Sequence, residues 1–413
     1  MKKPKQTANP SMTQSIRVLM LSYSYIEDDP RVVMEGRIIA SLGYMVDVAG
    51  VAMGFPPKQA PINGMKISIF PLINSYNPFI IGRGLWNLLR GKIESESSTQ
   101  RKSNIVSLLF YNLWVLRLWL GRRADIIHCQ EHQPLFIAWI LARLFRAKLI
   151  YDAHENTSLN RAGVGLKGKL AIRAEHFFLP RVDVVITVGE RLARFLRDRG
   201  ARQVVIVGNW KRISDYAVDS NIIAEMRDKL GIPEGTLVVS YIGALDPTRD
   251  ILPLVEAVSK MPDVHLIIAG RGSLADQIAE VASRNPNIHW LGWLSLDQVP
   301  LYTQLSGVIF CCINPGLQQS EFVAPNKLFD AFVAGKAVIA RAGLGEMSEI
   351  LEQIPAGIQL TEVTAESLQD TLRQLQNGNL LQILQNSAKE GGQLYNSSMT
   401  EQRLRDLYHD LIK

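Results

Sequence analysis

"EFVAPNKLFDAFVAGKAVIA", residues 321–340, carries the clearest fold signal in the chain. It begins as a loop, continues with helical periodicity, breaks at Gly335 and ends as an apolar run of strand length. Two acids and a base, Glu321, Lys327 and Asp330, fall where the loop enters the helix. Ligands of open parallel sheets bind beyond the carboxyl ends of the strands, so we expect these loop residues to face a ligand.

Apolar runs of strand length alternate with helical segments along the whole chain. In the first half the runs are "IRVLMLSYS", "MVDVAGVA", "KISIFPL", "ADIIHCQ", "AKLIYDAH", "VDVVITVG" and "QVVIVGN". After Asn209 the pattern restarts with "TLVVSYIGAL", "VHLIIAGRG", "IHWLGW", "GVIFCCI" and "KAVIARA". This alternation is typical of an α/β fold, and its restart predicts two doubly wound parallel-sheet, Rossmann-like domains that face a cleft.

A chain of 413 residues is too long for one ordinary core, which agrees with two domains. We expect a disordered polar tail at 1–14, an N-terminal domain at 15–208 and a C-terminal domain at 209–388. An amphipathic terminal helix is expected at 389–413. The polar start has no signal-peptide core, and no apolar run is long enough to span a membrane.

Charge is divided unevenly between the two halves. Residues 1–210 hold 29 Lys and Arg against 15 Asp and Glu, a net charge of +14, and the remainder holds 16 basic and 24 acidic residues, a net charge of −8. Anionic lipid, an anionic substrate or nucleic acid could each explain the basic half. Nucleic acid ranks last, because aromatic platforms and RNA-binding motifs are not evident. We therefore expect no nucleic-acid partner.

Cysteine usage favours a reducing, cytoplasmic setting. Cys129, Cys311 and Cys312 lie in apolar strand-like runs, which suits buried thiols. HExxH, CxxC and DxD patterns are absent from the sequence, so we predict no metal site.

Two strand-exit loops of the second half suggest a phosphate site. "GRGSLA", residues 270–275, matches a dinucleotide fingerprint, but the next strand brings no acid for a ribose, so NAD binding is the less favoured interpretation. In "IGALDPTRD", Gly243 ends a strand and Arg249 stands at the next helix start, which outlines a diphosphate site. The alternative is that Arg249 pairs with Asp246 or Asp250.

The first half offers polar residues at its own strand exits. "YDAHENTS" contains His154, and "CQEHQP" contains Glu131 and His132. "EDDPRVVMEG" contains Asp29 and Arg31, which could orient an acceptor, although Asp29 also reads as a helix N-cap.

Several of these motifs occur together in one order. "SYIGALDPTRDILPLVEAV", "VHLIIAGRGSL", "PNKLFDAFVAGKAVI", "IIHCQ…LIYDAHE" and "VDVVITVGERLARFL" make the chain resemble a GT-B glycosyltransferase of the family 4, group 1 type, over residues 15–413. The resemblance implies sugar transfer from a nucleotide diphosphate sugar to a hydroxyl acceptor, with retention, no metal and no cofactor. It also implies a nucleotide-sugar-binding C-terminal domain, an acceptor-side N-terminal domain and a terminal helix that crosses back to the latter.

The resemblance carries roles over to individual residues. Asp330 stands at the family acid that binds the ribose hydroxyls, and Lys327 and Arg249 would face the diphosphate. His154 is expected near the reacting carbon, as a catalytic residue with these two cations. The remaining donor-side candidates are Gly243, Gly270, Gly272, Trp293, Glu321 and Asn326. The acceptor-side candidates are Asp29, Arg31, Glu131 and His132.

The sequence departs from the family pattern at three places. The position eight residues before Asp330 is Phe322 instead of an acid, and Glu321 lies one residue earlier. Asp250 stands where members often have glycine, and the loop after the first strand is not glycine-rich. Three alternatives stay open. A nucleotide-sugar epimerase would share the fold and the donor, an NAD oxidoreductase is the next interpretation, and the departure at Phe322 keeps a non-catalytic nucleotide-sugar sensor open.

Residues 104–123, "NIVSLLFYNLWVLRLWLGRR", allow two interpretations. The apolar body with Trp114 and Trp119 and the basic end are typical of a helix lying in a membrane interface. A buried helix of the first domain explains the same pattern. The interfacial interpretation predicts peripheral contact with the cytoplasmic membrane face, close to a lipid-linked acceptor.

Overall fold

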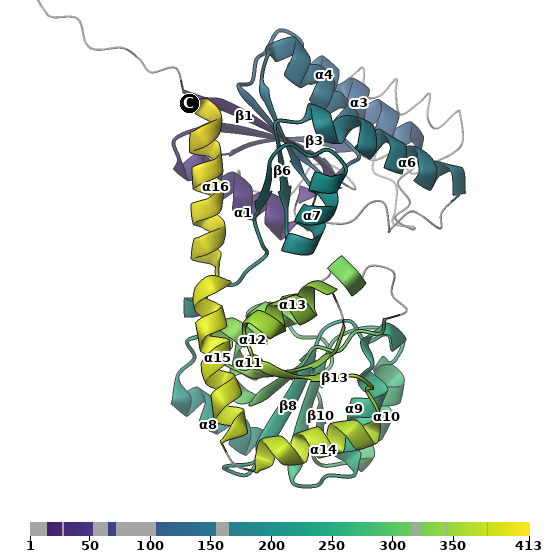
Figure 1. The fold of residues 1–413 in the computed structure, drawn as a ribbon, viewed down its shortest axis with the longest axis vertical. Helices are drawn as coiled ribbons and strands as arrows, with labels where there is room; N and C mark the ends of the chain where they lie inside the picture. Colours follow the sequence, from purple (N-terminus) through teal and green to yellow (C-terminus); the bar gives the residue numbers. More distant parts are fainter. Residues whose placement is uncertain are drawn as a thin grey trace, which may run out of the picture.

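The computed structural model describes residues 15–26, 29–52, 65–71, 105–153, 165–315, 320–322, 324–343, 345–377 and 379–413. The expected tail at 1–14 lies outside these residues. The described chain forms two α/β domains, stacked one above the other in Figure 1. The predicted pair of doubly wound parallel-sheet domains is confirmed.

The N-terminal domain is built on a seven-stranded parallel sheet of order β3-β2-β1-β4-β5-β6-β7. Its strands are β1 (Arg17–Tyr25), β2 (Met45–Ala52), β3 (Met65–Pro71), β4 (Ile126–Gln130), β5 (Lys148–Asp152), β6 (Val184–Thr187) and β7 (Val204–Ile206). Its helices are α1 (Pro30–Ser41), α3 (Ile105–Trp119), α4 (Leu135–Phe145), α6 (Gly165–Phe178), the short η2 (Leu179–Arg181) and α7 (Glu190–Asp198). Apolar clusters lie on both faces of this sheet, as expected for parallel strands between helices.

The C-terminal domain repeats this plan with a six-stranded parallel sheet of order β10-β9-β8-β11-β12-β13. Its strands are β8 (Leu237–Ile242), β9 (Val264–Ala269), β10 (Ile288–Trp290), β11 (Val308–Phe310), β12 (Ala337–Arg341) and β13 (Gly357–Leu360). Its longer helices are α8 (Ser220–Leu230), α9 (Ile251–Ser259), α10 (Ala275–Arg284), α11 (Val299–Leu305), α12 (Asn326–Ala334), α13 (Gly345–Gln353) and α14 (Ala365–Gln376). The short helices are η3 (Ile213–Tyr216), η4 (Pro247–Arg249) and η5 (Ser320–Phe322).

Two consecutive helices return the chain to the N-terminal domain (Figure 1). α15 (Leu380–Leu394) packs on α12, and α16 (Ser397–Ile412) packs on α1 and β7. Asn396 separates them and caps α16 by accepting from the backbone N–H of Ser398. Tyr408 of α16 is fully buried in the N-terminal core. The single helix expected at 389–413 is therefore the end of α15 followed by α16.

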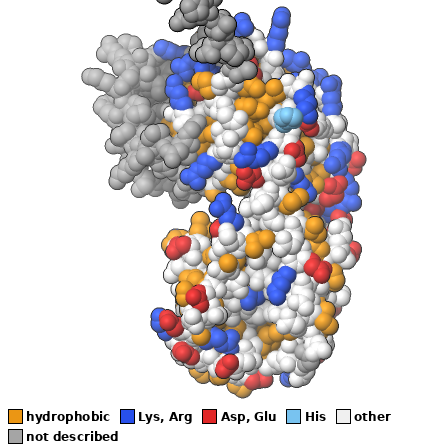
Figure 2. Space-filling model, turned by 90° about the vertical axis from the view of Figure 1, so that its left-hand side faces the viewer, with side chains coloured by type: hydrophobic (Ala, Val, Ile, Leu, Met, Phe, Trp, Pro, Cys, Tyr) orange, Lys and Arg blue, Asp and Glu red, His pale blue; other side chains and the backbone are white. Residues whose placement is uncertain are grey.

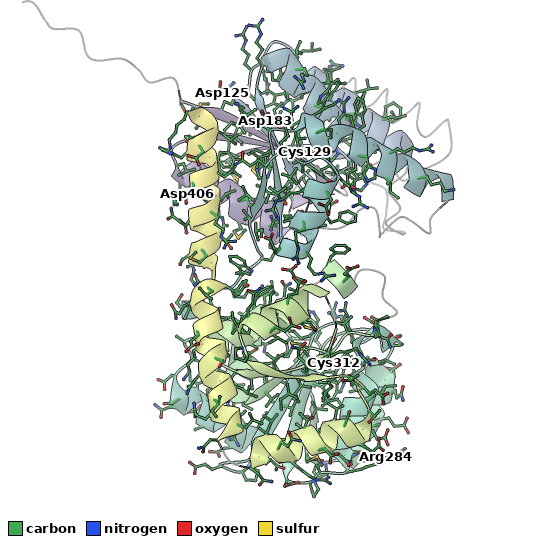
Figure 3. All side chains as sticks on the ribbon, in the orientation of Figure 1. Asp125, Cys129, Asp183, Arg284, Cys312 and Asp406 are labelled. Atoms are coloured by element: carbon green, nitrogen blue, oxygen red, sulfur yellow. The ribbon has the colours of Figure 1, made fainter. Side chains whose placement is uncertain are left out.

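The fold places the three cysteines and the two tryptophans of α3 in or against the apolar cores. All three cysteines are buried and free, and Figure 3 places Cys129 and Cys312 in different domains. Within α3, Trp119 is buried and Trp114 packs on Phe70, with 5.5 Å between ring centroids. Both tryptophans therefore contribute to the core. Among the described helices, none combines the length and apolar character needed to cross a membrane.

Candidate active site

Two glycine turns lie side by side at the carboxyl ends of β8 and β9. Gly243, Gly270 and Gly272 have φ between 149° and 156°, which L side chains rarely adopt. A Cβ on Gly270 would lie 1.7 Å from the carbonyl oxygen of Gly243, and one on Gly272 would lie 2.1 Å from that of Leu245. The packing of one turn on the other therefore requires glycine at these positions and leaves bare backbone at the strand ends.

Lys327, in the first turn of α12, points its ammonium at this backbone. Nζ lies 4.2 Å from the centroid of the Tyr241 ring, and a Cβ on Gly243 would come within 2.9 Å of it. Burial lowers the pKa of Lys327, and the charge of Arg249 acts in the same direction. Among the described residues, no carboxylate forms a salt bridge with this ammonium. An anion bound here would supply the missing counter-charge.

Arg249 is the second cation of the site and ends η4. Its Nε is buried and has no hydrogen-bond partner in the part of the chain that the structure describes. The sequence left open a pairing with Asp246 or Asp250. The Asp246 carboxylate stands 3.7 Å from Nε, an ion-pair distance without a hydrogen bond, and Asp250 is bound elsewhere. Among the described residues, the Nε–H of Arg249 therefore has no acceptor.

Asp250 adopts the backbone conformation that glycine would adopt at this position in the family. It has φ +49°, the left-handed conformation that glycine adopts without strain. Its carboxylate accepts from Nη2 and Nε of Arg341 at 2.7 and 3.0 Å, and from Asn314 at 3.3 Å. These bonds anchor the turn that precedes α9 and direct Asp250 away from Arg249.

Asp330 lies almost buried on α12. Its Oδ1 accepts a hydrogen bond from the Tyr216 hydroxyl at 2.8 Å, and burial raises the pKa of its carboxyl. An ionised carboxylate has about four acceptor sites, so this bond does not exhaust it. Nearby on the rim, Asn326 is exposed, and Trp293 is 58% exposed with Arg271 stacked over its ring at 4.6 Å.

Glu321 and Phe322, which stand where the family has its first acid, face the N-terminal domain. The Phe322 ring contacts Phe195 of α7, with centroids 5.2 Å apart, and Glu321 forms an ion pair with Arg191. The missing acid at Phe322 thus coincides with an apolar contact between the domains. A contact of Glu321 with the donor sugar stays a prediction.

A carboxylate of the C-terminal domain caps a helix of the N-terminal domain. Glu346 of α13 accepts from the backbone N–H groups of Glu190 and Arg191 at 2.9 and 2.6 Å, at the positive end of α7. Because α7 follows β6 and α13 follows β12, the carboxyl ends of both sheets meet here. The space-filling view shows the surface indented between the domains (Figure 2).

Arg31 occupies a structural position at the hinge between the domains. Its Nε and Nη2 donate to Asp152 at 2.7 and 3.0 Å, and Nη1 donates to the Val207 carbonyl and to Asn209, both at 2.9 Å. Glu35 is 3.1 Å away, and the guanidinium is almost fully buried. The acceptor contact expected from the sequence does not fit this placement, because these bonds already engage the guanidinium.

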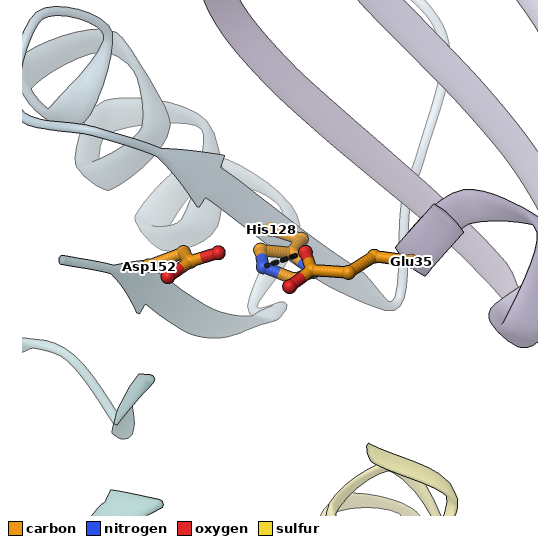
Figure 4. A group of neighbouring side chains, drawn as sticks. All are labelled: Glu35, His128 and Asp152. Carbon is orange, nitrogen blue, oxygen red and sulfur yellow. Dashed lines mark ion pairs between the residues drawn. The ribbon is translucent and has the colours of Figure 1, made fainter. Parts of the chain in front are cut away.

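Beside Arg31 lies a buried polar cluster formed by Glu35, His128 and Asp152 (Figure 4). Gln130 donates to Glu35 at 2.6 Å, and His128 Nδ1 shares a 2.8 Å hydrogen bond with the Tyr408 hydroxyl. Burial raises the pKa of Glu35 to about 8 and lowers the pKa of His128 to about 4.

These three side chains lie close enough to hold a metal ion. Arg31, however, already places a cation against both carboxylates, so we assign the cluster to the hinge. It joins α1, β4 and β5 to the linker after β7 and to α16.

The other acceptor-side candidates lie at strand exits of the N-terminal domain. Asp29 caps α1, accepting from Val32 N–H at 3.3 Å and from the Ser24 hydroxyl at 2.6 Å. Glu131 and His132 follow β4 and are half-buried, and Glu131 has φ +60°. His154 lies outside the described residues.

Family profiles match both domains in the order expected. The family described as "Glycosyl transferase 4-like domain" matches residues 96–210, and "Glycosyl transferases group 1" matches residues 222–393. The chain belongs to the group 1 glycosyltransferases. The resemblance recognised in the sequence is thereby confirmed.

One curated relative and two solved structures illustrate the relationship. WcaI of Escherichia coli K12, named as a glycosyl transferase of colanic acid biosynthesis, is 25% identical over 233 residues. That match spans 52% of this chain and 56% of WcaI, so it covers little more than half of the relative.

Sucrose-phosphate synthase of Thermosynechococcus elongatus aligns with a TM-score of 0.71 at 16% identity, over 96% of this chain and 99% of its own. HepE of Anabaena, solved with UDP, aligns with a TM-score of 0.66 at 15% identity, over 96% and 100%. At these identities the likeness shows the shared GT-B fold.

The glycine turns and the cations were found in the sequence, but sequence reasoning missed the residues that support them. Tyr241 lies under Lys327, Arg341 holds Asp250, and Glu346 caps α7 across the interface. Tyr241 was detectable, since it stands two residues before Gly243 in the same strand exit. Glu346 had no local signal, because its partners lie more than 150 residues away.

Proposed function

We propose that the protein transfers a sugar from a nucleotide diphosphate sugar to a hydroxyl acceptor, with retention at the anomeric carbon and without a metal. One observation carries the proposal: Arg249 and Lys327 lie near Tyr241 and the bare glycine turns, and neither has a hydrogen-bonded counter-ion among the described residues. In the transfer, the bond from the anomeric carbon to the diphosphate breaks and its electron pair leaves with the diphosphate. The acceptor oxygen bonds to that carbon and one proton is released.

The charge that develops on the leaving diphosphate explains why two cations are needed. Preorganised donors aimed at a developing charge usually supply the largest single contribution to catalysis. Lys327 gains most from such an anion, because burial already destabilises its charged form. We assign Arg249 and Lys327 to the diphosphate and the backbone of Gly243, Gly270 and Gly272 to its close approach.

We propose the remaining donor contacts for residues that lie around the diphosphate site. Asp330 would bind the ribose diol, since its carboxylate can accept further hydrogen bonds beside Tyr216. Trp293, Glu321 and Asn326 would contact the rest of the donor. On the opposite side, Asp29, Glu131 and His132 would meet the acceptor. His154 would contact the sugar near the reacting carbon.

The acceptor is proposed to belong to glycan, polysaccharide or glycolipid synthesis in the cytoplasm. The name of the relative WcaI supports a polysaccharide context. The net charge of +14 on residues 1–210 suits an acceptor carried by an anionic lipid at the cytoplasmic membrane face.

Donor turnover distinguishes this function from its alternatives. The protein is incubated with UDP-, GDP- and ADP-sugars, with and without acceptor extract and with a chelator, and released nucleoside diphosphate is measured. Acceptor-dependent release that survives chelation, with a product of unchanged anomeric configuration by NMR, supports a metal-independent retaining transferase. Sugar interconversion without acceptor would instead identify an epimerase. Nucleotide-sugar binding without turnover would identify a sensor.

A further inference from the structure

One face of the N-terminal domain exposes a layer of apolar side chains on three adjacent helices. α3, α4 and α6 pack side by side in Figure 1, joined by Trp119–Phe145 and Trp139–Phe178 ring contacts at 6.3 and 5.8 Å. The apolar side chains left exposed on or directly after these helices are Leu109, Leu113, Leu120, Phe136, Leu144 and Phe177. Each exposes between 47% and 65% of its surface. We call this the α3–α4–α6 face.

The exposure on α3 follows helical geometry. Tyr111, Val115 and Trp119 recur at every fourth position and are buried. Leu109 and Leu113 recur on the opposite side, away from the sheet. A helix that only covered a core would place polar residues there. The aromatic residues singled out in the sequence thus hold α3 to the sheet, and leucines form its outer stripe.

Arginines border this apolar layer and exposed acids are missing from its helices. The exposed arginines on or directly beside the three helices are Arg117, Arg122, Arg123, Arg143, Arg146, Arg173 and Arg181. α3 and α4 contain no Asp or Glu, and Glu175 of α6 is buried and accepts from the Tyr151 hydroxyl at 2.7 Å. Arg181 lies 3.7 Å from the Phe177 ring, which combines cation and apolar surface at one point.

We propose that the α3–α4–α6 face binds the surface of an anionic lipid bilayer. Apolar side chains that reach the boundary of headgroups and acyl chains, flanked by arginines at headgroup level, are the chemistry of interfacial binding. Such binding would keep the domain at the membrane without a spanning segment. The inference deepens the proposed lipid-carried acceptor and rests on that function for its purpose.

The charge pattern decides between a bilayer and a second copy of the chain. Two copies meeting through this face would bring both arginine sets together with no exposed acid of these helices to pair with them. An anionic bilayer offers negative charge along the whole border and an apolar interior beneath it. The lipid surface is therefore the occupant that satisfies both parts of the face.

The experiment measures binding of the full chain to vesicles, independently of sugar transfer. Co-sedimentation is compared for phosphatidylcholine vesicles with and without phosphatidylglycerol, at salt concentrations of about 0.1 M and about 1 M, where the Debye length is about 10 Å and about 3 Å. We expect binding only with phosphatidylglycerol and a loss of roughly tenfold or more at high salt.

Two variants separate the apolar and the charged contributions. Leu109→Gln/Leu113→Gln/Phe136→Gln should weaken binding roughly tenfold or more while keeping its salt dependence. Arg122→Gln/Arg123→Gln/Arg143→Gln/Arg146→Gln should abolish the preference for phosphatidylglycerol.

The matched control, Leu296→Gln/Ile383→Gln/Leu394→Gln, removes exposed apolar side chains of the C-terminal domain and should bind like the wild type. Melting temperature and turnover with a soluble acceptor confirm that each variant is folded. No binding at low salt, or equal losses in the control, would overturn the proposal. So would a dimer in sedimentation velocity that the leucine variant dissociates. Vesicle binding without sugar transfer would instead contradict the proposed function and leave the lipid face intact.

Discussion

Arg31 and Arg249 hold equivalent positions in two domains of the same architecture. Each follows the first strand of its sheet, β1 or β8, and lies close to the start of the next long helix. Arg31 is buried and makes four hydrogen bonds, two of them to Asp152. Arg249 is a quarter exposed, and its Nε has no hydrogen-bond partner among the described residues. Equivalent positions therefore carry one cation that is hydrogen-bonded by the protein and one that is proposed to bind a ligand.

The difference between the two arginines shows that equivalent positions of a repeated fold can serve stability in one domain and the proposed chemistry in the other. Around Arg31, two carboxylates share one cation, and the bonds to Val207 and Asn209 fix the linker between the domains. Around Arg249, the nearby carboxylate of Asp250 is held by Arg341. Arg249 is left with an ion pair to Asp246 that has no hydrogen bond, and a charge that is weakly paired in this way is a candidate for ligand binding.

We expect the largest effect at Arg31, the cation that is hydrogen-bonded within the protein. Arg31→Ala leaves the buried carboxylate of Asp152 without its cation, and we expect a loss of about 3–5 kcal/mol in the free energy of unfolding. Urea unfolding measures it. Arg37→Ala, on the exposed side of the same helix, should change stability by less than about 0.5 kcal/mol. Equal stability of both variants would show that Arg31 does not hold the hinge.

In the C-terminal domain, replacing the cations should lower turnover instead of stability. Arg249→Ala and Lys327→Ala should each lower kcat about 10²–10³-fold, equivalent to about 2.7–4 kcal/mol of transition-state stabilisation. Melting temperatures should stay close to wild type, because neither cation has a hydrogen-bonded carboxylate to lose among the described residues. Arg284→Ala, which removes an exposed ion pair with Glu280, is the control. Turnover close to wild type would remove both residues from the diphosphate site.

The comparison also shows which information the sequence contains. The strand runs other than β13, the glycine turns and the cations at the strand exits were predicted, because backbone pattern and helix starts are local. The partners were not, because they are distant in the chain: Arg31 and Asp152 are 121 residues apart, and Tyr216 and Asp330 are 114 apart. The direction of Trp114 and Trp119 was equally hidden, since α3 is apolar around most of its circumference.

A smaller effect on stability should depend on pH. Burial raises the pKa of Glu35 to about 8, so the folded state keeps a proton that the unfolded chain releases above its ordinary pKa of 4.5. Stability from this group is present below pH 4.5 and is lost as the pH rises toward 8. Glu35→Gln removes the titration.

The variant should therefore stay close to wild type near pH 5 and exceed it by on the order of 3 kcal/mol near pH 8, given about 1.4 kcal/mol per unit of pKa. Urea unfolding across this range, with Glu401→Gln on the exposed side of α16 as control, tests it. A constant difference between Glu35→Gln and wild type would show that Glu35 is ionised throughout.

The smallest effect concerns Asp330, which shares features of both arginines. Like Arg31 it is nearly buried and bound by a protein partner, the Tyr216 hydroxyl, and like Arg249 it interacts electrostatically with Lys327. Asp330→Asn keeps the shape but replaces one acceptor oxygen by a donor, so a ribose diol loses a charge-assisted hydrogen bond. We expect nucleoside diphosphate binding to weaken about tenfold, or about 1.5 kcal/mol.

Tyr216→Phe removes the competing protein bond and should leave affinity unchanged or raise it. Calorimetry with UDP, GDP and ADP measures both variants. If Tyr216→Phe weakens binding and Asp330→Asn does not, Asp330 supports η3 in the way Asp152 supports Arg31, and another residue holds the ribose.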